Sequence, residues 1–299
     1  MKKPGLNAMP KGFVAVCVLP GLFLVLLFLI FPLLNSVSMS VTNAMSLSAG
    51  TWQFIGIDNY VRMFTLDPHF RAALRNTFQI MLVVPAVVMF LALFFAFSLT
   101  QTKLKEKAVY RTLFFLPSVL SLVVVAVVFS AVFDPRPRGP LNSILGRFGI
   151  DAIPWLGDPT FALWAIIIVM IWQATGYFMV LHIAAIDSIS KEIFEAADID
   201  GATGATKLFR ITAPMLKDSI GITYILALSG TMGTSFILGR VMTAFGPGTS
   251  TLVLLGHMYN MAFGAAVFGY AMAIAVFSLV TALILSYLSR KLTYRSENW

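Results

Sequence analysis

Charged residues are scarce in this sequence of 299 residues. Only 11% are Asp, Glu, Lys or Arg, whereas 59% are hydrophobic and the mean hydropathy is +0.87. Soluble domains carry about 25% charged residues, so the composition excludes an ordinary soluble protein and indicates a polytopic membrane protein. The 21 Lys and Arg outnumber the 13 Asp and Glu. In a membrane protein, basic cytoplasmic loops explain this excess, and nucleic acid is not an expected partner.

Cysteine is almost absent as well. The single Cys17 lies in an apolar run and excludes a disulfide framework. The three histidines are His69, His182 and His257, which are far apart in the sequence. One cysteine with scattered histidines makes no metal-binding pattern, so we expect neither a metal nor a cofactor on this chain.

Six apolar runs are long enough to cross a bilayer as helices, which takes about 20 residues each. They cover residues 13–34, 76–100, 110–133, 160–184, 220–238 and 263–288. The first run has no small-x-small cleavage site close behind Pro32, which favours a retained span over a signal peptide. The predicted fold is therefore all-α, with six transmembrane helices.

The positions of Lys and Arg predict the orientation of these helices. Two thirds of the 21 Lys and Arg lie on the side that holds both termini. The positive-inside rule then places both termini in the cytoplasm. We expect a tail, first helix and external loop over 1–71, a five-helix core over 72–289 and a cytoplasmic tail over 290–299. The connection between the fourth and fifth runs falls on the cytoplasmic side.

That connection, 187–214, is the longest polar interruption in the second half of the chain. Its first part predicts a short helix that Ser190 can cap. Ile189, Ile193 and Ala197 recur every four residues and predict an apolar stripe, with Phe194 beside it. We call this connection the polar loop.

The second part of the polar loop predicts a bend and another short helix. Gly201 can end the first helix by adopting a positive φ. Thr203 can cap the second helix. Pro214 disfavours helical geometry at Ala213 and suits the first turn of the next span.

The stretch EAADIDGATGATKLFRITAP, residues 195–214, resembles the EAA loop of ABC importer permeases. The matching residues are Glu195, Ala196, Ala197, Gly201, Ile211 and Pro214. The sequence departs from the family at Ala213, where Leu is usual, and at Ser190, where sugar-type members often have Pro. Four flanking stretches resemble the sugar-importer branch, namely 54–60, 111–117, 155–159 and 246–248.

The resemblance implies the type I ABC importer permease fold in the inner membrane of a bacterium or archaeon. It implies a second permease, an ABC ATPase dimer and an external solute-binding protein as partners, with ATP and Mg²⁺ bound on the ATPase. The polar loop would then dock in a groove of the ATPase. The expected coupling residues are Glu195, Ala196, Ala197, Asp200, Gly201, Ile211 and Pro214.

Polar side chains in the fourth and fifth runs are candidates for the solute path. They are Trp172, Gln173, Thr175 and Tyr177 in the fourth run, and Tyr224, Ser229, Thr231 and Ser235 in the fifth. Neutral hydroxyls and amides beside aromatic rings suit an uncharged polyol, so a sugar or oligosaccharide is the favoured solute. Glycerol phosphate and peptide remain alternatives. Ser and Thr can also bond only to their own helix or across helices.

Other functions compete with this interpretation. An ion-coupled transporter commonly carries charged groups at membrane depth, but no Asp, Glu, Lys or Arg lies in the interior of any apolar run. Residues 201–207 only faintly resemble a phosphate-binding loop, since Thr206 replaces the required Gly. No catalytic set for an intramembrane enzyme is found. An amphipathic helix on the membrane surface usually has a basic polar face, whereas the polar loop begins acidic.

Overall fold

The computed structural model describes residues 11–45, 52–101 and 105–294. Regular structure in these ranges is helical apart from one isolated bridge between Thr42 and Phe54. The predicted basic tails at 1–10 and 295–299 lie outside the described residues. The chain divides into two compact units, Met1–Thr65 with Met258–Phe277, and Leu66–His257 with Ser278–Trp299.

Within the described ranges, five helices are long and apolar enough to cross a membrane. The first is nearly continuous through α1 (Lys11–Val25), the π-helical turn η2 (Leu26–Ile30) and α2 (Phe31–Ser40). The others are α4 (Pro68–Gln101), α8 (Pro159–Asp187), α12 (Lys217–Thr243) and α14 (Phe268–Tyr294). Most of them extend beyond the predicted runs, but α14 begins at Phe268, five residues after the predicted start of the sixth run at 263. At membrane depth an α-helix satisfies its backbone N–H and C=O groups through its own hydrogen bonds, which suits these spans to hydrocarbon.

The third predicted span is not one straight helix. It consists of α5 (Lys107–Val119) and α6 (Leu122–Val132), which are bent by 100° relative to each other. Leu120 and Ser121 between them have extended backbone, and Pro117 lies in the last turn of α5. A proline offers no N–H to the helix, so the last turn of α5 is weakened where the bend begins. The predicted count of six spans holds if this bent pair is one span.

The first unit is organised around Asn59 in α3 (Asp58–Thr65). Its buried amide donates to the carbonyl oxygens of Ser40 and Thr42, each at 2.9 Å. The backbone N–H of Gly269 donates to the carbonyl of Ala44 at 2.9 Å. Gly269, near the start of α14, therefore packs against the backbone of Thr42 and Ala44 within this chain. The unit also contains the π-helical turn η4 (Asn260–Gly264).

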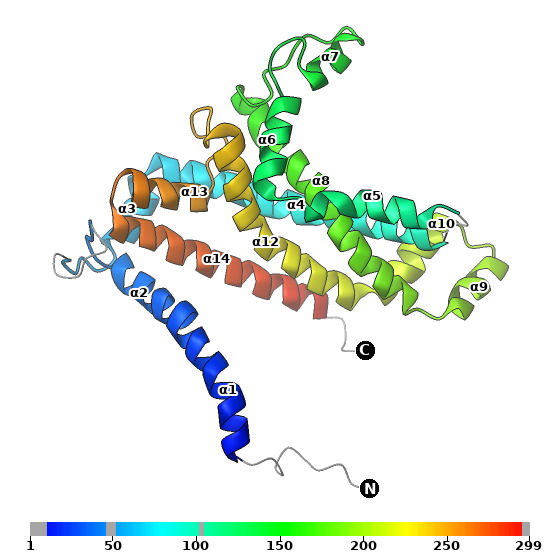
Figure 1. Cartoon of the computed structure of the whole chain (residues 1–299), viewed down its shortest axis with the longest axis horizontal. Coiled ribbons are helices and arrows are strands. Elements are labelled where there is room, and N and C mark those ends of the chain that lie inside the picture. Colours follow the sequence, from blue (N-terminus) through cyan, green and yellow to red (C-terminus); the bar gives the residue numbers. More distant parts are fainter. Residues whose placement is uncertain (1–10, 46–51, 102–104, 295–299) are drawn as a thin grey trace. The chain divides into compact units, whose positions relative to one another are not determined.

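In the second unit, α8 packs against α4 and α5, and α12 packs against α4, α6 and α8 (Figure 1). The buried faces are lined by aliphatic and methionine side chains such as Ile80, Val88, Ile166 and Met170. The closest approach is at Gly176. A Cβ atom there would lie 1.7 Å from the carbonyl oxygen of Phe114 and 2.9 Å from the Cα of Phe115. Only a glycine allows α5 and α8 to meet at this distance.

The connection after α12 is tied to the start of α4. The Asn76 amide donates to the carbonyls of Thr249 and Leu252, each at 2.9 Å. The Thr77 hydroxyl accepts from the N–H of Leu254 at the start of α13 (Leu254–Tyr259). These bonds replace the backbone partners that an irregular connection lacks. They fix the position of α12 at its C-terminal end. Residues 226–234 of α12 line part of the pocket described below.

The Gly176 contact generates a prediction about stability. Gly176→Val should lower the thermal unfolding midpoint of the detergent-purified protein, because the atoms that a side chain meets are backbone and cannot rotate away. Overpacking of this kind costs about 1–3 kcal/mol or more. Gly233→Val in α12 is the matched control, since a Cβ atom at Gly233 would have no heavy atom within 4 Å. Equal midpoints for the two variants would contradict the close contact.

Candidate functional site

The polar loop forms a helix, a sharp bend and a second helix. The first helix is α9 (Lys191–Ile199), with Ser190 at its N-cap position. The cap position is as predicted, but the Ser190 side chain makes no capping hydrogen bond. The predicted apolar stripe is confirmed at Ile189 and Ala197, which are buried together with Phe194 beside them. Ile193 departs from it, because the side chain is 36% exposed.

Gly201 makes the bend, with φ at +72° as the sequence predicts. The N–H of Gly201 donates to the carbonyl of Asp198 at 3.1 Å, and the N–H of Ala202 donates to the carbonyl of Ala197 at 2.9 Å. This pair of bonds is the Schellman motif, which satisfies the last carbonyls of a helix. Lys207 then forms an ion pair with Asp198 across the bend. The angle between the two helical parts is thus held by backbone and side-chain bonds.

The second helical part begins where Thr203 accepts from the N–H of Thr206 at 3.3 Å, as predicted. It runs through α10 (Gly204–Thr206), the π-helical η3 (Lys207–Thr212) and α11 (Ala213–Met215). The expectation that Ala213 leaves helical geometry is wrong, because its φ and ψ are −61° and −44°. The N–H of Ala213 bonds five residues back, to Leu208, in the π-helical turn that precedes Pro214. The break before α12 falls instead at Leu216, with φ −96° and ψ 11°.

The outer surface of the polar loop combines acidic and apolar groups. Of the predicted coupling residues, Glu195, Ala196, Asp200, Gly201 and Pro214 are exposed, Ile211 is partly exposed and Ala197 is buried. Two exposed apolar residues were not singled out from the sequence, Ile199 at 87% and Phe209 at 57% exposure. Ile199 falls outside the apolar stripe of α9, which is a sequence signal for an apolar side chain that points away from the protein.

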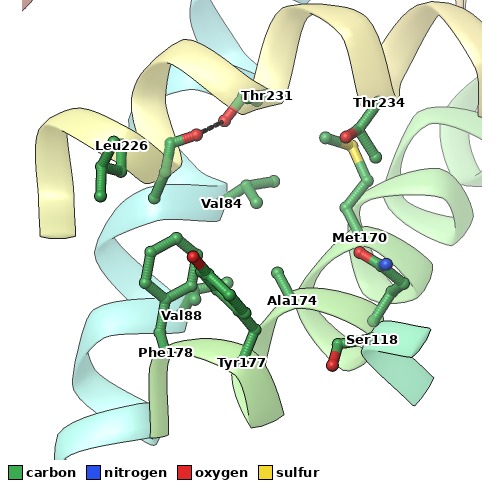
Figure 2. A pocket seen from close by; sticks show the side chains of 13 residues that line it. Val84, Val88, Ser118, Met170, Ala174, Tyr177, Phe178, Leu226, Thr231 and Thr234 are labelled. Carbon is green, nitrogen blue, oxygen red and sulfur yellow. Dashed lines mark hydrogen bonds between the residues drawn. The ribbon is translucent and has the colours of Figure 1, made fainter. Parts of the chain in front are cut away.

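A cavity of about 200 Å³ lies between α4, α5, α8 and α12 (Figure 2). Three predicted path residues line it, namely Gln173, Tyr177 and Thr231. Figure 2 shows Tyr177 and Phe178 on α8, Leu226, Thr231 and Thr234 on α12, and Val84 and Val88 on α4 around the same space. The lining contains no Asp, Glu, Lys or Arg. It therefore offers amide, hydroxyl and aromatic groups to a neutral molecule.

The other predicted path residues lie elsewhere. Trp172 and Thr175 line a separate apolar groove with α5, and the ring of Trp172 meets Phe129 at 5.0 Å. Tyr224 lines a third pocket. Ser229 and Ser235 bond to carbonyls of their own helix, those of Ile225 and Met232.

Sequence reasoning did not single out several lining residues, among them Ser118, Met170 and Phe178. Ser118 could have been noticed as a hydroxyl directly after Pro117 in an apolar run. Met170 and Phe178 resemble any other core residue of α8, and the sequence holds no signal that separates them.

Comparison with known proteins gives consistent matches. The family model described as "Binding-protein-dependent transport system inner membrane component" matches residues 64–294. The probable ABC transporter permease protein YurN of Bacillus subtilis is 36% identical over 92% of this chain and 95% of its own length. The lactose transport system permease protein LacF of Rhizobium radiobacter is 34% identical over 91% of this chain and 90% of its own.

A solved structure shares the fold. It is a bacterial alginate ABC transporter in complex with an alginate pentasaccharide-bound periplasmic protein. One of its chains superimposes with a TM-score of 0.84 at 23% identity, over 96% of both chains. At this identity the likeness concerns the fold alone.

The geometry of the polar loop predicts a labelling pattern. In a Cys17→Ser background, Ile199→Cys should react rapidly with a hydrophilic maleimide in detergent, because the Ile199 side chain is 87% exposed. Ala197→Cys should react at least tenfold more slowly, because Ala197 is 6% exposed and faces the protein. Labelling of both after denaturation controls for intrinsic reactivity. Equal rates in the folded protein would show that α9 does not rest on the face of Phe194 and Ala197.

Proposed function

Since this chain belongs to the family of binding-protein-dependent transport system inner membrane components, we propose that it is one permease subunit of a sugar or oligosaccharide importer. With a second permease it forms the membrane pathway. An external binding protein delivers the solute, and a separate ABC ATPase dimer, which binds ATP and Mg²⁺, drives transport.

The observation that carries the proposal is the rigid bend of the polar loop. Gly201, the Schellman bonds and the ion pair between Lys207 and Asp198 hold two helical parts at a fixed angle. Glu195, Ala196 and Ile199 stand exposed on this support. Such a surface suits a protein groove that accepts an apolar side chain and a carboxylate. Coupling requires that the loop bind the open and closed ATPase with different free energies.

The cavity supports a neutral polyol as the solute. Its amide and hydroxyl groups can exchange hydrogen bonds with sugar hydroxyls, and Tyr177 offers an aromatic face. Glycerol phosphate is less suitable because no Lys or Arg lines the cavity. The lack of lining carboxylates likewise disfavours proton coupling. At about 200 Å³ the cavity is smaller than the 300–1,000 Å³ typical of ligand sites, which fits a half-site completed by the second permease.

The length of α8 and the distribution of charge support an orientation of the subunit. The 29 residues of α8 span about 43 Å, which is enough to cross the membrane and would put the segments before and after α8 on opposite sides. The Lys and Arg excess favours the cytoplasm for the polar loop and for both termini. The ATPase would then meet the polar loop directly, and the solute would arrive at the other side.

Gly201→Val tests the coupling role. A β-branched residue at a positive φ destabilises that backbone conformation by roughly 1 kcal/mol or more. The backbone at residue 201 should therefore adopt another φ, which changes the direction of the second helical part. We expect normal membrane insertion, reduced co-purification of the ATPase and loss of the solute-dependent rise in ATP hydrolysis. Glu195→Ala should act in the same direction but more mildly.

Gly204→Val is the matched control for this test, because Gly204 has equally open surroundings but no positive φ. It should retain both the ATPase and its stimulation. Full retention of ATPase and stimulation by Gly201→Val would refute the coupling role of the polar loop.

Gln173→Ala and Tyr177→Ala test the solute path. Each removes a polar side chain from the cavity lining, and a lost neutral hydrogen bond costs about 1 kcal/mol, or roughly fivefold in affinity. Solute uptake in proteoliposomes should fall, while stimulation of ATP hydrolysis by the binding protein should persist. Ser229→Ala is the control, since its hydroxyl bonds to its own helix and lines none of the described pockets. Normal uptake by both cavity variants would exclude this cavity from the path.

A further inference from the structure

A pocket of about 340 Å³ lies where three helices of the second unit end together. Its lining comes from the last turn of α4, the first turns of α5 and the last turns of α8. The apolar part of the lining includes Leu99 and Ile183, and the charged part consists of Lys107, Arg111 and Asp187. Because Asp187 is also the first residue of the polar loop, the pocket lies at the polar-loop end of α8. We call it the α5 pocket.

The charges of the α5 pocket are not neutralised by one another. The Arg111 and Asp187 side chains are exposed, and neither makes a hydrogen bond or an ion pair within the ranges that the structure describes. Lys107 is half-buried, and its Nζ donates to the carbonyl oxygen of Thr100 at 3.2 Å. An ammonium group has three donors, so two remain for another acceptor. The pocket therefore offers two cationic groups and one carboxylate to a molecule from outside the chain.

The α5 pocket lies at the level of the lipid headgroups. The apolar runs 76–100 and 160–184 end beside it, and the run 110–133 begins beside it. Leu99 belongs to the first of these runs, whereas Asp187 lies beyond the end of the second. A molecule in this pocket thus has hydrocarbon on one side and water on the other, as a lipid headgroup has.

The same three helices also carry the apolar groove that Trp172 lines. This groove has a volume of about 540 Å³, and Phe95 of α4 and Leu113 of α5 line it as well. Its residues are nearer the middle of each helix than those of the α5 pocket. Tyr110 of the groove and Arg111 of the pocket are neighbours on α5. The arrangement suits an amphiphile, with a charged head in the pocket and an apolar tail along the groove.

The combination of charges matches a zwitterionic phospholipid. A phosphate accepts from cationic donors, and the guanidinium of Arg111 can bind it through two parallel hydrogen bonds. A primary ammonium has three N–H donors, for which the carboxylate of Asp187 is a suitable acceptor. Phosphatidylethanolamine carries both groups. Phosphatidylglycerol carries only the phosphate, and its negative charge would face Asp187 without a cation between them.

We propose that the α5 pocket binds one phosphatidylethanolamine molecule in the leaflet next to the polar loop. Its phosphate accepts from Lys107 and Arg111, its ammonium donates to Asp187, and an acyl chain lies along the apolar groove. The lipid then joins the ends of α4, α5 and α8 at the point where the polar loop begins. The inference uses neither the solute nor the ATPase, so it holds or fails independently of the proposed function.

Native mass spectrometry of the full chain tests the site. The chain is purified in detergent, stripped of lipid and mixed with equimolar phosphatidylethanolamine, phosphatidylglycerol and phosphatidylcholine of identical acyl chains. Wild type should retain phosphatidylethanolamine about fivefold more than either other lipid, as expected for one additional partly exposed charge-assisted contact. Phosphatidylcholine should bind less because its quaternary ammonium has no N–H donor.

Two substitutions separate the two halves of the headgroup. Arg111→Ala should lower the retention of phosphatidylethanolamine about fivefold, because it removes a phosphate contact, and Arg111→Lys should restore part of it. Asp187→Asn should instead abolish the preference for phosphatidylethanolamine over phosphatidylglycerol, because it removes the carboxylate that distinguishes them. The expected restoration by Arg111→Lys and the altered ratio for Asp187→Asn are effects that a loss of folding would not produce.

Arg210→Ala and Asp218→Asn are the matched controls. Both residues are exposed at or directly after the polar loop, and neither lines the α5 pocket. Retention and lipid ratios should equal those of wild type. Equal lipid retention by wild type, Arg111→Ala and Asp187→Asn would overturn the proposal, as would a wild-type preference for phosphatidylglycerol. Displacement of the lipid by millimolar glycerophosphoethanolamine, which has the headgroup but no acyl chain, would assign the pocket to a soluble phosphate ester and also overturn it.

Discussion

The packing of α8 against α4 and α5 is the interaction on which the rest of the second unit depends. Hydrocarbon provides no hydrophobic force between helices, so close approach and good packing must hold them together. Gly176 permits the carbonyl of Phe114 to enter the surface of α8. This contact places α5, and with it Ser118, beside the cavity. One glycine in α8 therefore influences the shape of this cavity.

The same helix links the two surfaces to which our proposed function assigns a role. At its start, the Asp158 carboxylate caps α8 by accepting from the N–H of Thr160 at 2.7 Å. The cavity is lined from the middle of α8, and the polar loop begins at its other end. In the proposed function, α8 would be the element that connects the solute path with the surface that meets the ATPase.

Irregular backbone occurs at the places where function is proposed. The bend between α5 and α6, the Schellman turn at Gly201 and the π-helical η3 all depart from straight helix. At Gly201 and in η3, backbone hydrogen bonds within the polar loop satisfy part of the freed groups. The connection after α12 is irregular as well, and there the side chains of Asn76 and Thr77 bond to its backbone. Irregularity of this kind positions side chains that a continuous helix would direct elsewhere.

The sequence alone determined the features that depend on short stretches of chain. Apolar length predicted the spans, and the Gly201 bend and the Thr203 cap followed from residues within a few positions of each other. Where two local rules competed, the result depended on context. Pro214 was expected to remove Ala213 from the helix, but a preceding π-helical turn accommodated it. The bend at Leu120 was missed because both halves were counted as one apolar run, although Pro117 lies just before the bend.

Only the tertiary structure decided which polar side chains meet. Gln173, Tyr177 and Thr231 line one cavity, whereas Trp172 and Thr175, on the same helix as the first two, face another groove. All are neutral or aromatic residues in apolar runs, and composition does not separate them. Their separation depends on the rotation of α8 about its axis, which the packing of Gly176 on α5 and of Ile166 and Met170 in the core determines. A cavity shared by four helices is a property of their packing, and no single helix encodes it.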